Sequence, residues 1–449
     1  MLGLASCASV PNVEPFIAQA AATAAKPQLA GPRGPLSAAE SAAILDRLRA
    51  QAPHSDVLKR HLVIEEAITE NPLVVGNRTR ILPDGETSFR AMFAAMRRAR
   101  DHINLEYYIV EDIVSDNQHL GDLLIAKRHQ GVQVNIMYDS YGSNATPAAF
   151  FARLRAAGIQ IVDYNPVNPL QTNGGSPDDR DHRKILVTDG HTAIIGGVNL
   201  ASIYNVRRFA KSGAIEGQPA DIWRDTDMQI DGPVVVQIQT LFVTHWQAQK
   251  GPPLDQKNFF PTIAPVGHDI IRTLGSTPKD AVPRYYVTIL SAIRTAEKRI
   301  FLATAYFVPT DREVTDLADA VRRGVDVRLL LPGKSDSEQA LTMGRSKYRD
   351  LLQAGVKIYE TRDAILHSKM GVVDGVWSII GSSNVDRRSV VFNDEVDCVV
   401  LGTDTGRRME ALFSQRFAEA KQIDLAHWHA PPLTEQIKQM FESAWENQL

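Results

Sequence analysis

One pattern of residues occurs twice in this chain at the same spacing. Each copy has a His-x-Lys triplet, four residues, an Asp, six residues, and then a pair of small residues followed by x-Asn. The first copy comprises His182, Lys184, Asp189, Gly196, Gly197 and Asn199, and the second comprises His367, Lys369, Asp374, Gly381, Ser382 and Asn384. A lone His-x-Lys triplet is a weak signal, but agreement at every position in two places indicates an internal duplication.

Helical stretches alternate with short apolar runs in the same order before both copies. The apolar runs cover 103–109, 132–138 and 159–164 in the first half, and 300–307, 325–331 and 356–359 in the second. Glycine follows the preceding helix at matching joints, as expected for a helix C-terminal stop. The alternation predicts an α/β fold, with two α/β/α sandwich lobes related by a pseudo-two-fold axis.

The chain is too long for one ordinary core, since it has 449 residues. A capping box, Ser37 with Glu40, predicts the start of a helix. We therefore expect a flexible N-terminal tether over 1–36, a helical extension over 37–72, a first lobe over 73–250, and a second lobe over 262–449 that ends in C-terminal helices. The lobes would be joined by a segment rich in Pro and Gly.

Strand geometry explains the residue types of the repeated pattern. In His-x-Lys on a strand, both side chains point to one face because the side-chain period is two. The small pairs Gly196-Gly197 and Gly381-Ser382 let the backbone pass close to a ligand, beside Asn199 and Asn384. Asp189 and Asp374 are expected to be structural, in the turns behind the lysines. Two such halves would place two His, two Lys and two Asn around one phosphate.

This set of side chains is suited to exchange at a phosphodiester. One His attacks phosphorus and carries the phosphoryl group, while the other protonates the leaving alcohol. The lysines and asparagines would bind the non-bridging oxygens. No H-E-x-x-H motif or carboxylate cluster for a catalytic divalent ion stands out, so we expect neither a metal nor a cofactor.

A further pair of carboxylates follows from aligning the halves. Asp225, in Trp223-Arg224-Asp225-Thr226-Asp227, aligns with Glu395, in Asn393-Asp394-Glu395-Val396-Asp397. A carboxylate on the second ring nitrogen sets the tautomer of a histidine and raises its basicity. We expect the pairs to cross, with Glu395 on His182 and Asp225 on His367. The alternative is that both are ion pairs at strand edges.

At this level of detail the chain resembles the phospholipase D superfamily, and more narrowly the bacterial cardiolipin synthases. The resemblance covers about residues 72–425 and includes Tyr107-Tyr108-Ile109, Trp223-Arg224-Asp225-Thr226, Tyr306-Phe307-Val308-Pro309 and Asn384-Val385-Asp386-Arg387-Arg388-Ser389. It implies transfer of a phosphatidyl group from one phosphatidylglycerol to a second, with release of glycerol. It also implies that His182 is the nucleophile and His367 the acid.

Two other activities use the same residues. A phospholipase D hydrolase would pass the phosphatidyl group to water and release phosphatidic acid. A nuclease of the superfamily is disfavoured by the formal net charge of -3, which offers no general attraction for nucleic acid. The partners that we expect are therefore phospholipids at a membrane surface, with no obligate protein partner.

The location implied is the bacterial envelope, in association with the membrane. Leu4-Ala5-Ser6-Cys7 has the small-residue pattern that precedes the lipid-modified cysteine of a bacterial lipoprotein. The charged and apolar segments of a secretion signal do not precede it, so the match is either a remnant or an accident. Peripheral binding to the cytoplasmic face is the alternative. No stretch reaches the roughly 20 consecutive apolar residues needed to span a bilayer.

Overall fold

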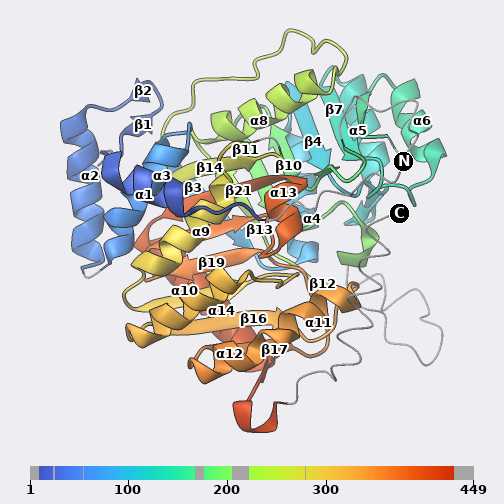
Figure 1. Ribbon diagram of the computed structural model, residues 1–449. Coiled ribbons are helices and arrows are strands. Elements are labelled where there is room, and N and C mark those ends of the chain that lie inside the picture. The colour runs from blue at the N-terminus through green and yellow to red at the C-terminus, as the bar shows by residue number, and fades with distance from the viewer. Residues whose placement is uncertain are drawn as a thin grey trace, which may run out of the picture.

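The computed structural model describes residues 10–23, 26–53, 55–166, 176–204, 222–278 and 280–428. A large β-sheet runs through the described part of the chain, with helices packed on both of its faces (Figure 1). The sheet consists of two similar halves, which correspond to the two lobes.

The first lobe has seven main strands in the order β8-β7-β4-β10-β11-β13-β3. The strands β8, β7 and β4 are parallel to one another, and the later neighbours are antiparallel. The elements of this lobe are β3 (Leu73–Leu82), α4 (Gly85–Arg98), β4 (His102–Tyr107), β5 (Val114–Ser115), β6 (Gln118–His119), α5 (Leu120–His129), β7 (Gln133–Asp139), α6 (Ala148–Ala156), β8 (Gln160–Tyr164), β9 (Arg180–Asp181), β10 (Lys184–Thr188), β11 (Thr192–Gly196), the 3-10 helix η3 (Ser202–Tyr204), β12 (Trp223–Arg224), β13 (Asp227–Asp231) and α8 (Val235–Ala248).

The second lobe repeats this order as β17-β16-β15-β19-β20-β21-β14, with the same parallel and antiparallel pairs. Its elements are β14 (Asp269–Ser276), α9 (Arg284–Thr295), β15 (Arg299–Ala303), α10 (Asp311–Arg322), β16 (Asp326–Pro332), α11 (Glu338–Ser346), α12 (Tyr348–Gln353), β17 (Lys357–Thr361), β18 (Ile365–Leu366), β19 (Met370–Val373), β20 (Trp377–Gly381), α13 (Arg387–Val391), β21 (Asn393–Leu401), α14 (Thr403–Glu419), β22 (Lys421–Gln422) and η4 (Leu425–His427). The equivalent strands β3 and β14 pair with each other and join the two halves. The predicted fold class, a duplicated α/β fold, is confirmed.

Alternating side chains divide the interior into layers. On β10, Leu186 packs into one core cluster, whereas Ile185 and Val187 pack into another on the opposite face. The second of these clusters also contains Met370 and Val372 of β19, together with residues of α8 and α14. The two lobes therefore share a central hydrophobic core, and each lobe has an outer core of its own.

The N-terminal part of the chain differs from the predicted tether. The structure places a helix, α1 (Glu14–Thr23), and two short strands, β1 (Leu29–Gly31) and β2 (Gly34–Pro35), within 1–36. Val13, Ala20 and Leu29 are buried in the outer core of the second lobe. The prediction of a flexible tether was wrong for these residues, because α1 packs on α3 (Arg60–Ile68) and α9 although its Ala-rich sequence has no strong amphipathic pattern.

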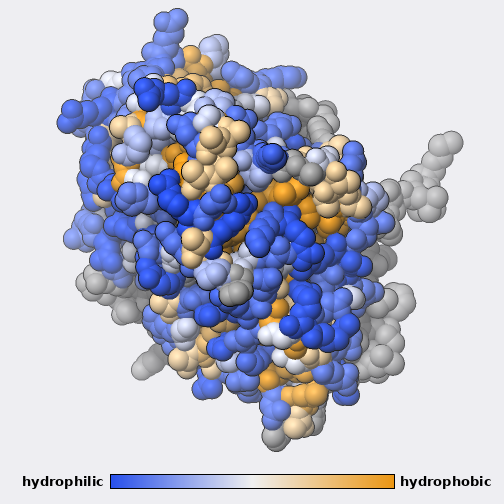
Figure 2. Space-filling view, turned by 90° about the vertical axis from the view of Figure 1, so that its left-hand side faces the viewer, coloured by the Kyte–Doolittle hydropathy of each residue, from blue (hydrophilic) through white to orange (hydrophobic). Residues whose placement is uncertain are grey.

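The helical extension that follows agrees with its sequence signal. Both hydrogen bonds of the predicted capping box, between Ser37 and Glu40, are present at the start of α2 (Ala38–Gln51). The short 3-10 helix η1 (Asp56–Leu58) and α3 (Arg60–Ile68) complete it. The face that carries α1 and α2 is mainly hydrophilic, with apolar side chains in scattered patches (Figure 2). No helix among the described residues is long and apolar enough to cross a membrane.

Candidate active site

Two short parallel ladders bring each motif histidine to the other lobe. Strand β9, which leads into the first motif, pairs with the start of β21, and the backbone N–H of His182 donates to the carbonyl of Asp394 at 2.9 Å. Likewise β12 pairs with β18, and the N–H of His367 donates to the carbonyl of Arg224 at 2.7 Å. The next residue after each accepting carbonyl, Glu395 or Asp225, therefore comes to lie beside a histidine of the opposite lobe.

The carboxylates contact the histidines in this crossed arrangement. Nδ1 of His182 lies 3.0 and 3.1 Å from the two carboxylate oxygens of Glu395. Nδ1 of His367 lies 2.7 Å from Oδ2 of Asp225. All four side chains are buried. A carboxylate at Nδ1 assigns the ring proton to that nitrogen and leaves Nε2 available for chemistry.

Each motif lysine lies next to the histidine of its own triplet. Nζ of Lys184 donates to the carbonyl of His182 at 2.5 Å, and Nζ of Lys369 donates to the carbonyl of His367 at 2.6 Å. Nζ of Lys369 is also 3.2 Å from Nε2 of His367. Lys184 lies over the ring of Tyr108, 5.4 Å from its centroid. The strand alternation expected from the sequence thus places His and Lys on one face.

Burial controls the charge state of these groups. It lowers the pKa of His182 to about 4, against the opposing effect of Glu395, and lowers the pKa of Lys184 to about 7. Burial and the Lys369 charge also lower the pKa of His367. Each lysine acts on the histidine of the opposite lobe as well, which shows that the four groups share one electrostatic environment. Such a site favours the neutral form of each imidazole. An anion bound between the lysines would stabilise their charged forms.

The two motif asparagines lie at the ends of the turns that follow β11 and β20. The carbonyl oxygen of Asn199 accepts the N–H of Ile109 at 3.1 Å, and its amide donates to the hydroxyl of Tyr204 at 3.2 Å. The carbonyl oxygen of Asn384 accepts the N–H of Tyr306 at 3.3 Å. Non-bridging phosphate oxygens accept hydrogen bonds, so the amide N–H groups of the two asparagines are the atoms suited to bind a phosphate.

The small residues of the pattern make room for the carboxylates. A Cβ at Gly197 would lie 2.3 Å from Oδ1 of Asp225, and one at Gly381 would lie 2.1 Å from Oδ1 of Asp397. A Cβ at Gly196 would meet Asp227 at 2.3 Å in the same way. Ser382 replaces the second glycine in the second lobe, and its hydroxyl donates to Glu395 at 2.5 Å.

Asp189 and Asp374 lie at the far ends of the motif strands. Asp189 has a positive φ of 53° and its carboxylate accepts the backbone N–H groups of residues 100 to 102 at 2.8–3.1 Å. Asp374, with φ 54°, accepts the N–H groups of residues 297 to 299 at 2.8–3.4 Å. Each joins a hairpin turn to the loop before the neighbouring antiparallel strand, β4 or β15, which is a structural contribution.

Three residues near the site were not singled out from the sequence. The hydroxyl of Tyr204 lies 3.2 Å from Nδ1 of His367, and the ring of Trp223 lies 4.8 Å from the ring of His367. Tyr204 follows Asn199 by five residues, where the second copy has Ser389, so the repeat gave no signal for it. The third, Asp227, accepts the N–H of Val198 at 3.1 Å and aligns with Asp397, so the repeat could have revealed it.

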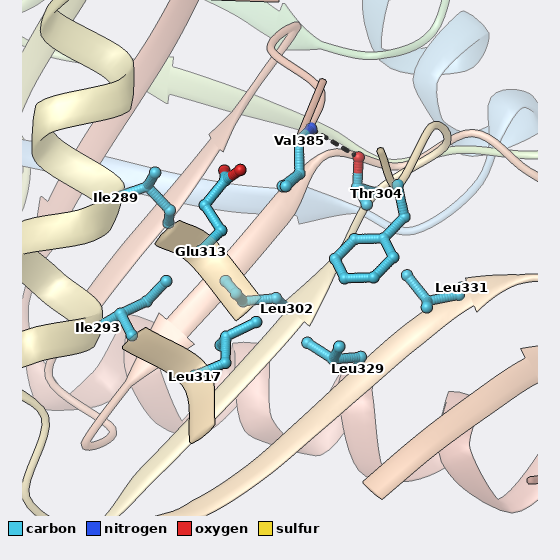
Figure 3. Close-up of a pocket in the computed structure, with 10 residues that line it drawn as sticks. Ile289, Ile293, Leu302, Thr304, Glu313, Leu317, Leu329, Leu331 and Val385 are labelled. Carbon is cyan, nitrogen blue, oxygen red and sulfur yellow. Dashed lines mark hydrogen bonds between the residues drawn. The ribbon is translucent and has the colours of Figure 1, made fainter. Parts of the chain in front are cut away.

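A small, almost entirely apolar pocket lies in the second lobe, lined by Ile289, Leu302, Leu317, Leu329 and Phe307 among others (Figure 3). The backbone N–H of Val385, next to Asn384, donates to Thr304 at 3.1 Å at its edge. Burial raises the pKa of Glu313, which also lines it, to about 7. The pocket contains none of the motif side chains, but the hydroxyl of Thr304 at its edge donates to the carbonyl oxygen of Asn384 at 3.3 Å.

The duplicated fold, with a histidine and a lysine from each lobe and crossed carboxylates, defines a phospholipase D-type phosphodiester-exchange site. A family model described as "Cardiolipin synthase, PLD-like domain" matches residues 92–207 and 289–417. The chain belongs to this family of phospholipase D-like cardiolipin synthases.

Individual relatives support the same assignment. The chain is 33% identical over 390 residues to a cardiolipin synthase of Geobacillus kaustophilus, covering 86% of this chain and 74% of the relative. It is 33% identical over 363 residues to cardiolipin synthase A of Pseudomonas aeruginosa, covering 79% and 69%. Among solved structures, a phosphatidylserine synthase of Haemophilus influenzae superposes with a TM-score of 0.64 over 86% of this chain and 98% of that chain. The identity to it is 11%, so that similarity concerns the fold.

Proposed function

We propose that this protein is a phosphatidyltransferase that makes cardiolipin and glycerol from two molecules of phosphatidylglycerol, through a phosphohistidine. The observation that carries the proposal is the pair of buried histidines, each with a carboxylate of the opposite lobe on Nδ1. The names of the curated relatives supply the substrate class.

In the first half-reaction, His182 is the nucleophile. Its pKa of about 4 keeps the ring neutral at neutral pH, and Glu395 leaves the lone pair on Nε2. Nε2 forms a bond to phosphorus, and the bond between phosphorus and the headgroup oxygen breaks. Nε2–H of His367 gives its proton to that oxygen, so that glycerol leaves as a neutral alcohol.

The bound phosphodiester prepares the acid. Its negative charge offsets Lys184 and Lys369, whose charges lower the pKa of His367 in the free protein. Substrate binding therefore raises the pKa of His367 and favours the protonated ring. The lysine ammonium groups and the asparagine amides bind the non-bridging oxygens, where charge builds up in the transition state.

The second half-reaction reverses the roles. A headgroup hydroxyl of the second phosphatidylglycerol gives its proton to Nε2 of His367, and its oxygen attacks phosphorus. The bond between phosphorus and His182 breaks, which releases cardiolipin and restores both histidines. Because these substrates reside in a bilayer, the protein would act at a membrane surface. Lipidation of Cys7, which lies outside the described residues, is the proposed attachment, and mass spectrometry of the natural N-terminus tests it.

Product analysis tests the proposed acceptor. Purified protein is incubated with vesicles of phosphatidylglycerol, and lipids and released glycerol are quantified. Cardiolipin and glycerol in equal amounts are expected. Phosphatidic acid without cardiolipin would show that water is the acceptor and would overturn the transferase proposal.

The assignment of the two histidines has its own test. A phosphodiester with a nitrophenol leaving group needs no proton from an acid, so His367→Ala should form the phosphohistidine from it nearly as fast as the unmodified protein. His182→Ala should form none. The opposite pattern would assign the nucleophile to His367, without affecting the proposed overall reaction.

A further inference from the structure

A second cluster of charged side chains lies directly behind the first motif. In the segment 181–184, His182 and Lys184 face the active site, so Asp181 and Arg183 face the opposite side of the strand. There they meet Glu106 of β4, His245 of α8 and Asp394 of β21, all buried. None of these five side chains takes part in the proposed reaction.

Three of them are placed as ligands of one ion. Nδ1 of His245 lies 2.8 Å from Oε1 of Glu106 and 4.0 Å from Oδ2 of Asp181. A ligand atom from each of the three residues lies within 4.8 Å of the other two. Metal–ligand bonds of about 2.0–2.2 Å in a tetrahedral site require ligand atoms about 3.3–3.6 Å apart, which lies between the two measured distances.

Two carboxylate oxygens in the cluster have no hydrogen bond to any residue that the structure describes. They are Oε2 of Glu106 and Oδ2 of Asp181, and both atoms are inaccessible to solvent. Buried carboxylate oxygens are normally hydrogen-bonded or bound to a cation, since the desolvation is otherwise costly. An ion between these residues would satisfy both.

The cluster contains more carboxylates than cationic side chains. Glu106, Asp181 and Asp394 contribute three carboxylates, and Arg183, at 3.3 Å from Glu106 and 3.5 Å from Asp394, contributes one guanidinium. With all three carboxylates ionised and the His245 ring neutral, the forms that bind metals, two negative charges remain. One divalent cation neutralises them.

The second lobe shows that the fold itself does not require this cluster. The pairing of Ile185 with Glu106 corresponds to that of Met370 with Ala303 in the second lobe. The motif spacing likewise aligns Asp181 with Leu366. Both Ala303 and Leu366 are buried apolar residues. The polar cluster is thus a feature of the first lobe alone.

We infer that Glu106, Asp181 and His245 form a binding site for a divalent transition metal of the zinc type, which stabilises the strand that carries His182. One imidazole with two carboxylates suits zinc, and to a lesser degree manganese. The side-chain amide of Gln249, 3.3 Å from Nε2 of His245, would orient the imidazole through its other nitrogen, and Asp394 lies 3.7 Å from the same atom.

The test is metal binding by the full chain. Protein dialysed against a chelator is titrated with Zn²⁺, and separately with Mn²⁺, in competition with a chromophoric chelator, and bound metal is measured by mass spectrometry. We expect about one ion per chain, and Asp181→Asn and His245→Gln should lower the affinity by more than ~100-fold, since second-shell changes alone cost about 10–100-fold.

The matched control is His61→Gln. His61 is another buried histidine, 2.8 Å from the buried Glu65, but among the described residues it belongs to no group of three side chains that could hold a metal ion. This variant should bind the metal as the unmodified protein does. Zn²⁺ should also raise the melting temperature of the unmodified protein and of His61→Gln, but not of Asp181→Asn. Failure of the unmodified protein to bind either metal, or equal binding by Asp181→Asn and His245→Gln, would overturn the inference.

Discussion

Replacing Asp225 by Asn removes the negative charge that faces His367 and leaves the side chain almost unchanged in size. In the structure Oδ2 of Asp225 lies 2.7 Å from Nδ1 of His367 and is fully buried. The contact also raises the pKa of His367, against the effects of burial and Lys369. Without it, the protonated ring needed to expel the alcohol is less populated.

The size of the effect follows from this one contact. A hydrogen bond between charged groups contributes about 1.5–3 kcal/mol net, more than a neutral bond. Loss of that amount in the transition state corresponds to a decrease of about 10- to 150-fold in kcat, at 1.36 kcal/mol for each factor of ten. Asp225 acts through His367, and its loss lowers the pKa of His367. The decline of activity at alkaline pH should therefore shift to lower pH.

The assay is the rate of cardiolipin formation in vesicles, measured across pH, together with thermal unfolding. Asp231→Asn is the control, at the end of the following strand β13, because Asp231 pairs with Arg78 at a partly exposed site and should change activity by less than about twofold. A folded Asp225→Asn protein with unaltered kcat and pH profile would refute the role assigned to Asp225.

Three further changes have definite expected outcomes. In an assay of cardiolipin formation, Gly197→Ala should lower activity at least as much as Asp225→Asn. The added Cβ would lie 2.3 Å from the Asp225 carboxylate. Tyr204→Phe should lower kcat by about 2- to 10-fold and shift the pH profile, because one neutral hydrogen bond to His367 contributes about 0.5–1.5 kcal/mol. Glu313→Gln should stabilise the protein increasingly as the pH rises from 5 to 8 in thermal unfolding, by roughly 3 kcal/mol at most, because the pKa of Glu313 is raised from 4.5 to about 7.

The sign for Glu313 follows from its raised pKa. The neutral acid is favoured in the folded chain, so its contribution is complete below the unfolded pKa and is lost as the pH rises through about 7. A difference in melting temperature between Glu313→Gln and the unmodified protein that is constant with pH would contradict this prediction. For Gly197 the control is Gly402→Ala, whose nearest contact would be at 3.4 Å, and equal activity losses would contradict the steric argument. Unchanged pH dependence in Tyr204→Phe would reduce that residue to a packing role.

Much of the site was predictable because the chain contains two copies of it. Aligning the copies identified Asp225 and Glu395 as equivalent, although the segments before them differ in length. The crossed contacts in the structure follow from the ladders β9–β21 and β12–β18, which exchange strands between the lobes. A residue with no counterpart, such as Tyr204, gave no such signal.

Other features depend on packing that composition does not reveal. Residues 14 to 23 are rich in alanine and lack a strong amphipathic pattern, yet α1 is anchored by the ion pair between Glu14 and Arg294 at 2.6 Å. Residues 429–449, at the end of the second lobe where C-terminal helices are predicted, lie outside the described part of the chain. For α1, the contacts that decide its structure are made with elements distant in sequence.

The sequence by itself determined the duplication, the α/β class and the face of the strand on which each His and Lys lies, because strand periodicity and matched spacing are local properties. The sequence also predicted the crossed pairing of carboxylates and histidines, but only the tertiary structure gave the contact distances and the burial that lowers the pKa values of His182 and Lys184. It alone brought together Glu106, Asp181 and His245, which are far apart in the chain. Desolvation and charge depend on all neighbours in space, and those neighbours come from both lobes.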